Sequence, residues 1–490
     1  MPPLAPAASP GLPTLSRRAL LAGSAAFAVA ACAERLPLPS PSTAASAPLT
    51  AEPEGKPSAA ATAAPSASAS PAGPTGAPSA SPAPSERPAF GRRILYRDGA
   101  MTDGRSDDLR VGVSVLVEDG RIRWIRPSDD EAEAGPAGGL EIVDASGATF
   151  VPGMVDAHSH VVLPGGAHWI ERADDPPAAL VEVAERNARL LTGAGVRWAR
   201  DVGAPREADP TDGRVRALSL GVRDRWRDRP GYPHIRAAGT WLDKAGTLPP
   251  AVHTVSAETA DELLAEATRQ LDDGADLLKL YLDGPDRDDS PWTAREVRRV
   301  VDMAHARGAP VTAHSSRLPG ARAGVLGGVD AIEHGMELDA ALCREMARRG
   351  TFLVSTLCIF DSWRSFGRTT KLVRFASGDG RRATEARAER AVESVQLAHA
   401  AGVAIATGTD FGGGSTRANQ LAWEVEALVR AGLEPWQALG AATWRGGELL
   451  GEPDAGVIRE GGPADFFLVH GDPTSDPSAL WRVWRVAWAD

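Results

Sequence analysis

Cysteine is scarce in this chain of 490 residues, which contains only Cys32, Cys343 and Cys358. So few thiols can build neither a disulfide framework nor a thiolate zinc cluster, and any metal ion must be bound by imidazole and carboxylate groups. Basic charge is also in deficit, because the formal net charge is -11. A nucleic-acid polymer needs a basic protein face, so the composition argues against that partner and favours a small-molecule substrate.

The apolar run near the N-terminus is too short to cross a bilayer. Arg17 and Arg18 precede an Ala-rich apolar stretch that ends at Cys32, which is typical of an export signal over residues 1–32. The paired arginines resemble a twin-arginine signal, and the residues before Cys32 resemble a lipoprotein cleavage box with Cys32 as the lipidated residue. We predict an exported, periplasmic or cell-surface bacterial lipoprotein that meets the membrane only through this lipid. An uncleaved N-terminal anchor is the alternative.

Large apolar side chains are nearly absent from residues 33–90, which are dominated by Ala, Pro and Ser. Such a segment cannot bury enough apolar surface to offset the entropy lost on ordering. We therefore predict a disordered linker between the signal and the folded part of the chain. The oligomeric state is left open, and a homo-oligomer is compatible with these features.

Two kinds of pattern occur after residue 91. Short β-type runs near both ends, in residues 91–150 and 453–490, are expected to pair into one small β-sandwich-like domain. Between them, in residues 151–452, apolar strands alternate with amphipathic helical segments, which is typical of an α/β fold with a parallel sheet. Eight strands predict a closed (β/α)8 TIM barrel. They are expected at residues 149–157, 196–202, 235–238, 277–282, 309–313, 329–333, 351–356 and 403–408.

Polar residues that can bind metal ions stand at the carboxyl ends of several expected strands, where the catalytic groups of this barrel belong. The first strand ends with His158 and His160, which project the same way because they are two residues apart. His314, His334 and Asp410 end the fifth, sixth and eighth strands. Each alone could be a satisfied core residue. Their common placement indicates a metal site.

Lys279 interrupts the apolar fourth strand in a chain that otherwise uses Arg, since Lys occurs elsewhere only at positions 56, 244 and 371. Burial favours the neutral amine, which can act as a nucleophile towards carbon dioxide, whereas Arg cannot. A lysine that extends to the barrel rim is the alternative, but Arg would serve that purpose equally well.

The chain resembles the amidohydrolase superfamily, and within it imidazolonepropionase-like and Xaa-Pro dipeptidase-like members. The resemblance covers about residues 92–490 and is carried by residues 151–160, 196–203, 274–279, 311–314, 332–335 and 407–410, and by parts of 424–465. It implies two divalent ions bridged by N-carboxylated Lys279. It places His158, His160 and Asp410 on one ion, and His314 and His334 on the other.

The chemistry of these groups agrees with the resemblance. Two cations that share a hydroxide lower its pKa, while one ion polarises the scissile carbonyl. Asp410 can act as the catalytic residue that takes a proton from the attacking water and passes it to the leaving amine. Imidazole and carboxylate ligands suit zinc best and leave manganese, cobalt and iron open.

The substrate is less well indicated. Related dipeptidase-like enzymes often carry Gly-Gly-His-Gly after the third strand, whereas this chain has a different loop that ends at His253. His253, Tyr281 and Arg200 are candidate substrate contacts, with a surface position for His253 and packing or salt-bridge roles for the other two as alternatives.

The leading hypothesis is a metal-dependent amidohydrolase that cleaves a C–N bond, in dipeptides or N-acyl amino acids. A mononuclear cyclic-amide hydrolase or deaminase, and a non-catalytic surface-anchored binding protein, are the alternatives.

Overall fold

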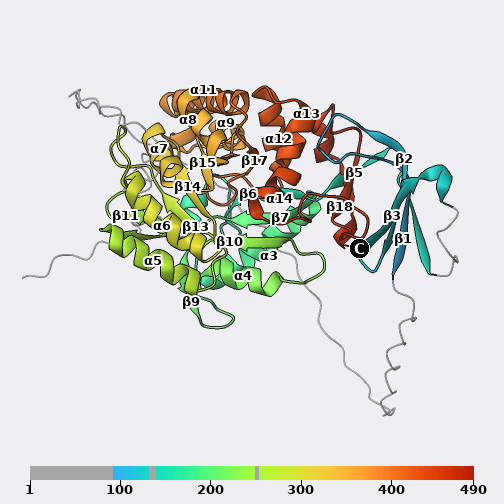
Figure 1. The fold of residues 1–490 in the computed structure, drawn as a ribbon, viewed down its shortest axis with the longest axis horizontal. Helices are drawn as coiled ribbons and strands as arrows, with labels where there is room; N and C mark the ends of the chain where they lie inside the picture. Colours follow the sequence, from blue (N-terminus) through green and yellow to red (C-terminus); the bar gives the residue numbers. More distant parts are fainter. Residues whose placement is uncertain (1–91, 132–138, 249–252, 490) are drawn as a thin grey trace, which may run out of the picture. The chain divides into compact units, whose positions relative to one another are not determined.

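The computed structural model describes residues 92–131, 139–248 and 253–489 (Figure 1). The predicted export signal, the linker and Cys32 lie outside the described residues. No helix in the described part of the chain combines the length and apolar character needed to traverse a bilayer.

The central region is an α/β fold with two parallel sheets (Figure 1). One sheet has the order β10 (His234–Ala237), β7 (Val196–Asp201), β6 (Met154–Ser159). The other has the order β12 (Thr254–Ala257), β11 (Trp241–Lys244), β13 (Leu278–Tyr281), β14 (Val311–Ser315), β15 (Ala331–His334), β16 (Phe352–Ser355), β17 (Ile405–Thr407). All their pairings are parallel, as expected for βα units.

Isolated parallel bridges connect these two sheets. Ser159 bridges Phe411 just beyond β17, and Ala238 bridges Leu277 just before β13. Backbone hydrogen bonds run beside them, from Asp410 N to His158 O at 2.8 Å and from Asp276 N to Ala237 O at 2.9 Å. The described strands thus form two sheets joined at single bridges, and one continuous closed ladder is not observed among them.

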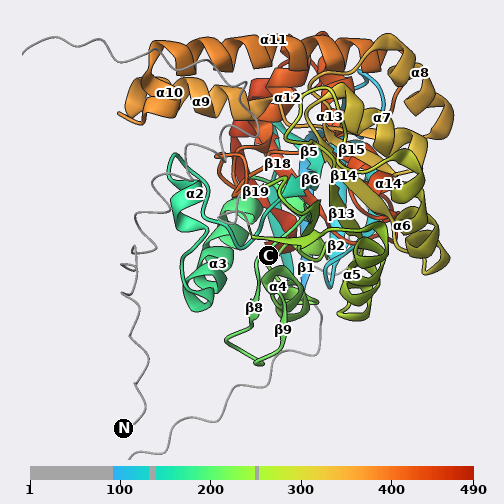
Figure 2. The same ribbon diagram turned by 90° about the vertical axis from the view of Figure 1, so that its left-hand side faces the viewer.

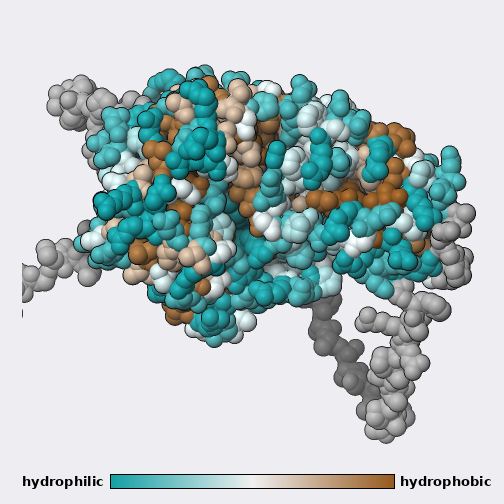
Figure 3. All heavy atoms as spheres, in the orientation of Figure 1, coloured by the Kyte–Doolittle hydropathy of each residue, from teal (hydrophilic) through white to brown (hydrophobic). Residues whose placement is uncertain are grey.

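Helices surround the parallel strands (Figures 1 and 2). They are α2 (Trp169–Arg172), α3 (Pro177–Gly193), α4 (Leu218–Trp226), α5 (Ala260–Asp272), α6 (Ala294–Ala306), α7 (Leu318–Gly327), α8 (Ala340–Arg349), α9 (Cys358–Thr369), α10 (Val373–Ala376), α11 (Gly378–Ala400), α12 (Leu421–Arg430), α13 (Pro435–Ala441) and α14 (Trp444–Leu450). The face in Figure 3 is largely hydrophilic, with smaller hydrophobic groups.

Helix α6 illustrates how the sequence specifies these helices. Thr293 and Glu296 form a reciprocal capping box at its start. Val297, Val300, Val301 and Ala304 are buried at three- and four-residue spacing, so one stripe of the helix packs inward.

A separate sheet contains both ends of the described chain. Its order is β19 (Val483–Val486), β18 (Phe466–His470), β5 (Ala148–Pro152), β1 (Arg93–Met101), β2 (Arg110–Glu118), β3 (Arg121–Pro127), with β4 (Leu140–Asp144) paired to β1. Tyr96, Phe150 and Phe466 meet edge to face in its core. The hydrogen bonds define one branched sheet, and the β-sandwich-like arrangement stays a prediction.

The expected strand 149–157 is wrong as a single element. Residues 148–152 pair antiparallel with β18, and only the part from Met154 onward joins β7. The break falls at Gly153, where an added Cβ would lie 2.6 Å from Arg197 Cβ. Both halves are buried on every residue, so hydrophobic pattern cannot separate them. The remaining expected strands coincide with β7, β10, β13, β14, β15, β16 and β17 to within a few residues. Strands β11 and β12 were not expected.

Candidate metal centre

His158, His160 and Asp410 converge at the carboxyl ends of β6 and β17. One donor atom of each lies within 4.8 Å of the others, and all three residues are buried. Asp410 Oδ1 is 3.4 Å from His158 Nε2 and 3.3 Å from His160 Nε2. The structure therefore assembles one half of the expected ligand set around a single point.

Three imidazoles in this region, those of His158, His160 and His334, have a partner on the Nδ1 atom that orients the ring. His158 Nδ1 donates to Glu333 Oε2 at 2.6 Å, and His160 Nδ1 donates to Gly203 O at 2.8 Å. His334 Nδ1 hydrogen-bonds with Thr356 Oγ1 at 2.9 Å. Contacts of this kind select the tautomer and leave Nε2 available to a cation.

His314 and His334 lie beside the first cluster. The His334 ring centroid is 4.6 Å from that of His158 and 4.6 Å from that of His314. His314 Nε2 is 3.3 Å from Asp283 Oδ2. Burial lowers the pKa of His314 against the opposing effect of Asp283, and lowers that of His334 well below its usual range. Both rings are therefore neutral, as metal ligation requires.

Lys279 projects from β13 into the same interior. It is 2% exposed, and its Nζ atom has no hydrogen-bond partner among the described residues. Burial, opposed by Glu333 and Asp410 and assisted by Arg200, lowers the pKa of Lys279 to about 8. An unpartnered buried amine is costly unless something else satisfies it.

Asp410 is held ionised. Burial acts to raise its pKa, but the imidazoles of His158, His160 and His334 bring it well below the usual range. The backbone at Asp410 has φ 52° and that at His334 has φ 68°, the left-handed region that residues with a side chain rarely adopt. Two candidate ligands thus carry backbone strain, a feature that concentrates at functional sites.

Glycines allow the segment after β17 to approach the candidate ligands. A Cβ at Gly408 would lie 2.3 Å from His158 Cβ, and one at Gly413 would lie 2.6 Å from His160 Nε2. These positions leave no room for a side chain, so the close approach requires glycine.

The three candidate substrate contacts differ in their surroundings. Tyr281 stacks on His314 with ring centroids 4.2 Å apart. Arg200 is 3% exposed and donates to Glu333 Oε1 at 2.5 Å and to Ala157 O at 2.6 Å, so the structure favours the salt-bridge alternative over a substrate contact. His253 Nε2 lies 3.1 Å from Asp174 Oδ1, and the contacts described for it do not include the candidate ligands.

Several residues of the site escaped the sequence analysis. Glu333 and Asp283 each contact a candidate imidazole, and Trp241, on the unexpected strand β11, meets the His160 ring edge-on at 4.9 Å. Glu333 directly precedes the predicted ligand His334, and this adjacency could have marked Glu333 as a residue of the site. Nothing local distinguishes Asp283 or Trp241 from ordinary loop residues.

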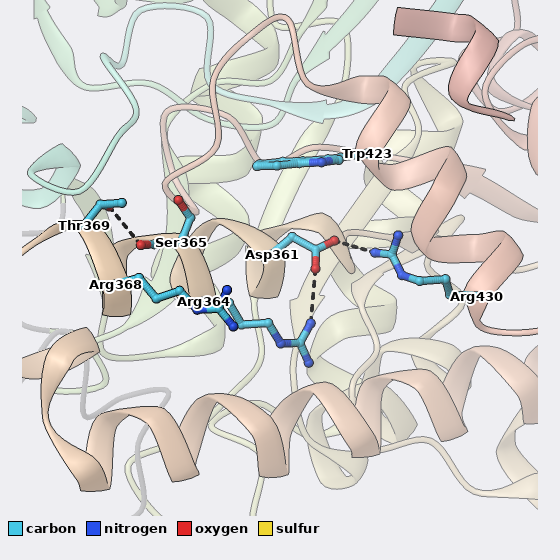
Figure 4. Close-up of a pocket in the computed structure, with 7 residues that line it drawn as sticks. All are labelled: Asp361, Arg364, Ser365, Arg368, Thr369, Trp423 and Arg430. Carbon is cyan, nitrogen blue, oxygen red and sulfur yellow. Dashed lines mark hydrogen bonds and ion pairs between the residues drawn. The ribbon is translucent and has the colours of Figure 1, made fainter.

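A concavity lined by residues of α9 and α12 is separate from this cluster. It has a volume of about 360 Å³ and is lined by Trp423, Asp361, Ser365, Thr369 and three arginines (Figure 4). Asp361 pairs with Arg364 at 3.2 Å and Arg430 at 2.5 Å. None of the candidate ligands lines it.

The fold and the cluster define an α/β protein with a candidate cation site at the carboxyl ends of its parallel strands. Residues 149–486 match the amidohydrolase family, and the chain belongs to that family, a family of hydrolases. The resemblance found in the sequence is thereby confirmed.

Individual relatives support the same assignment. An uncharacterized protein of Mycobacterium tuberculosis is 30% identical over 382 residues, which cover 76% of this chain and 89% of that protein. Imidazolonepropionase of Anaeromyxobacter dehalogenans is 28% identical over 406 residues, which cover 74% of this chain and 84% of the enzyme. The structure of a Xaa-Pro dipeptidase with bound methionine in its active site is similar in fold, with a TM-score of 0.68 at 23% identity over 80% of this chain and 97% of that one.

Proposed function

We propose that this protein hydrolyses an amide C–N bond, in a dipeptide or an N-acyl amino acid, with two divalent metal ions held in a closed (β/α)8 barrel. The observation that carries the proposal is Lys279, a buried amine without a described partner, in a region that also holds four imidazoles and Asp410. The two isolated bridges between the parallel sheets support barrel closure.

The donor chemistry fits two metal ions. In the proposed centre, one ion is held by His158, His160 and Asp410, and the other by His314 and His334. Lys279 would hold both ions as a carbamate, which its neutral amine would form with carbon dioxide by making an N–C bond and releasing a proton. Neutral imidazoles and carboxylates favour zinc. When bound, such ions lower the pKa of coordinated water and polarise the scissile carbonyl.

Asp410 is the proposed catalytic residue. Its pKa is held well below the usual range, so it is ionised at neutral pH and can accept a proton from the attacking water. It then transfers that proton to the leaving nitrogen. Tyr281, stacked on His314, is a proposed substrate contact.

A mononuclear centre, in a cyclic-amide hydrolase or deaminase, is the second candidate. It is favoured by one observation: among the described residues, the donor atoms that already converge within 4.8 Å are those of His158, His160 and Asp410 alone. The relative named imidazolonepropionase supports a cyclic substrate.

A hydrolysis screen of the metal-loaded, full-length protein tests both candidates. Panels of dipeptides, N-acyl amino acids and cyclic amides would be run alongside metal analysis. Turnover of linear amides with two ions per chain supports the leading proposal, whereas turnover of cyclic substrates with one ion supports the second. Metal binding without turnover on any panel would overturn both in favour of a non-catalytic binding protein.

A further inference from the structure

Glu333 is a fully buried carboxylate that lies between a candidate metal ligand and two other strands. Its relative exposure is 0%. Its Oε2 atom accepts the 2.6 Å hydrogen bond from His158 Nδ1 on β6. Its Oε1 atom accepts hydrogen bonds from Arg200 on β7 and Thr312 on β14. The two oxygens therefore have separate partners, and one is reserved for the imidazole.

This contact crosses the interior between the two parallel sheets. His158 and Arg200 belong to the parallel sheet of β10, β7 and β6. Thr312 and Glu333 belong to the parallel sheet that runs from β12 to β17. Glu333 also directly precedes His334, a candidate ligand of the second ion. Glu333 thus contacts His158, a ligand of one proposed ion, and is the sequence neighbour of His334, a ligand of the other.

We propose that Glu333 is a positioning residue of the metal centre, which holds His158 with Nε2 turned towards Asp410, while Arg200 and Thr312 hold Glu333. The inference rests on the proposed metal centre. The geometry of His158 supports it, because with Nδ1 bound to Glu333 its Nε2 atom lies 3.4 Å from Asp410 Oδ1. A carboxylate on the outer nitrogen orients a ligand imidazole and increases its basicity.

The competing explanation is that Arg200 and Glu333 form a buried ion pair that contributes only to folding. Replacing Glu333 alone cannot separate the two, because it leaves Arg200 buried without a counter-charge and can unfold the protein. The double variant Arg200→Met/Glu333→Gln removes both charges together. A glutamine side chain keeps the shape of Glu333 but withdraws the negative charge from His158.

A second buried pair offers a matched control. Arg197 Nε donates to Asp465 Oδ1 at 2.7 Å, and their side chains are 12% and 5% exposed. This pair joins β7 to the residue before β18 and has no described contact with the candidate ligands. Arg197→Met/Asp465→Asn therefore removes an equivalent ion pair without disturbing His158.

The experiment measures Zn²⁺ affinity of full-length wild type and both double variants by competition with a chromogenic chelator, with thermal unfolding of the metal-free proteins in parallel. We expect Arg200→Met/Glu333→Gln to bind Zn²⁺ about 10- to 100-fold more weakly, and the control to bind as wild type does, whatever stability each loses. The visible spectrum of the Co²⁺-loaded protein should change in the first variant only.

Wild-type Zn²⁺ affinity in Arg200→Met/Glu333→Gln, or an equal loss in the control, would overturn the proposal. Since affinity is measured without substrate, a wild-type protein that binds Zn²⁺ but hydrolyses nothing would count against the proposed function and not against this role of Glu333.

Discussion

Replacing Lys279 with methionine is expected to move metal binding and metal-free stability in opposite directions. The ammonium is buried, and a pKa near 8 in place of 10.5 corresponds to about 3 kcal/mol for keeping the charge inside the fold. Methionine fills much of the same space without a charge. At pH 7 the metal-free variant should therefore be more stable than the metal-free wild type, by up to about 3 kcal/mol.

The stability difference between the metal-free wild type and the variant should depend on pH in a defined direction. Below pH 8 the amine is protonated in both the folded and the unfolded chain, so the full cost applies to the wild type. Between pH 8 and 10.5 the unfolded chain binds more protons, and the stability of the metal-free wild type should rise with pH towards that of the variant. Denaturant unfolding of chelator-treated proteins across this range measures the difference. If the difference in unfolding free energy between the wild type and the variant does not become smaller as the pH rises, the electrostatic argument is refuted.

Metal content supplies the other half of the test. Lys279→Met should lower bound metal from about two ions per chain towards one or none, because both coordination shells lose a bridging oxygen. Lys279→Arg should behave in the same way, since guanidinium stays cationic and cannot be carboxylated. Acetate should restore part of the activity of a Lys279→Ala variant. Two ions and near-normal turnover in Lys279→Arg would refute the carbamate and favour the mononuclear centre.

Four other outcomes are expected. Asp410→Asn should lower kcat by about 10²-fold or more, because a proton acceptor is lost, and an unchanged kcat in a metal-loaded variant would contradict this role. Gly408→Ala should cost about 1–3 kcal/mol of stability and weaken Zn²⁺ binding, because its Cβ would lie 2.3 Å from His158 Cβ. Gly193→Ala, with open space around the new Cβ, is its control and should do neither. Deleting residues 33–90 should leave kcat unchanged, and a loss of folding would show that the composition argument fails. Cys32→Ser should abolish fractionation with membranes if Cys32 is lipidated; a variant that still sediments with them would exclude that anchor.

The sequence was sufficient to predict the parallel α/β fold, and it placed three residues that the structure brings together at strand ends. Apolar strands alternating with amphipathic helices specify βα units, and parallel strands bring their carboxyl ends to one edge. His158 and His160 were predictable as a pair because alternate strand residues share a face. His158, His160 and Asp410 do converge, which local pattern and strand order together anticipate.

The tertiary structure alone decided which polar groups support that cluster. Arg200 was read as a candidate substrate contact, but its orientation depends on Glu333, which is 133 residues away in sequence. Likewise the chain passes from one sheet to another at Gly153, where an added Cβ would lie 2.6 Å from Arg197 Cβ. Trp241 meets His160 from β11, a strand that the hydrophobic pattern did not predict. Periodicity reports which face of an element is buried, whereas the partner of a buried charge is chosen by packing between segments far apart in the chain.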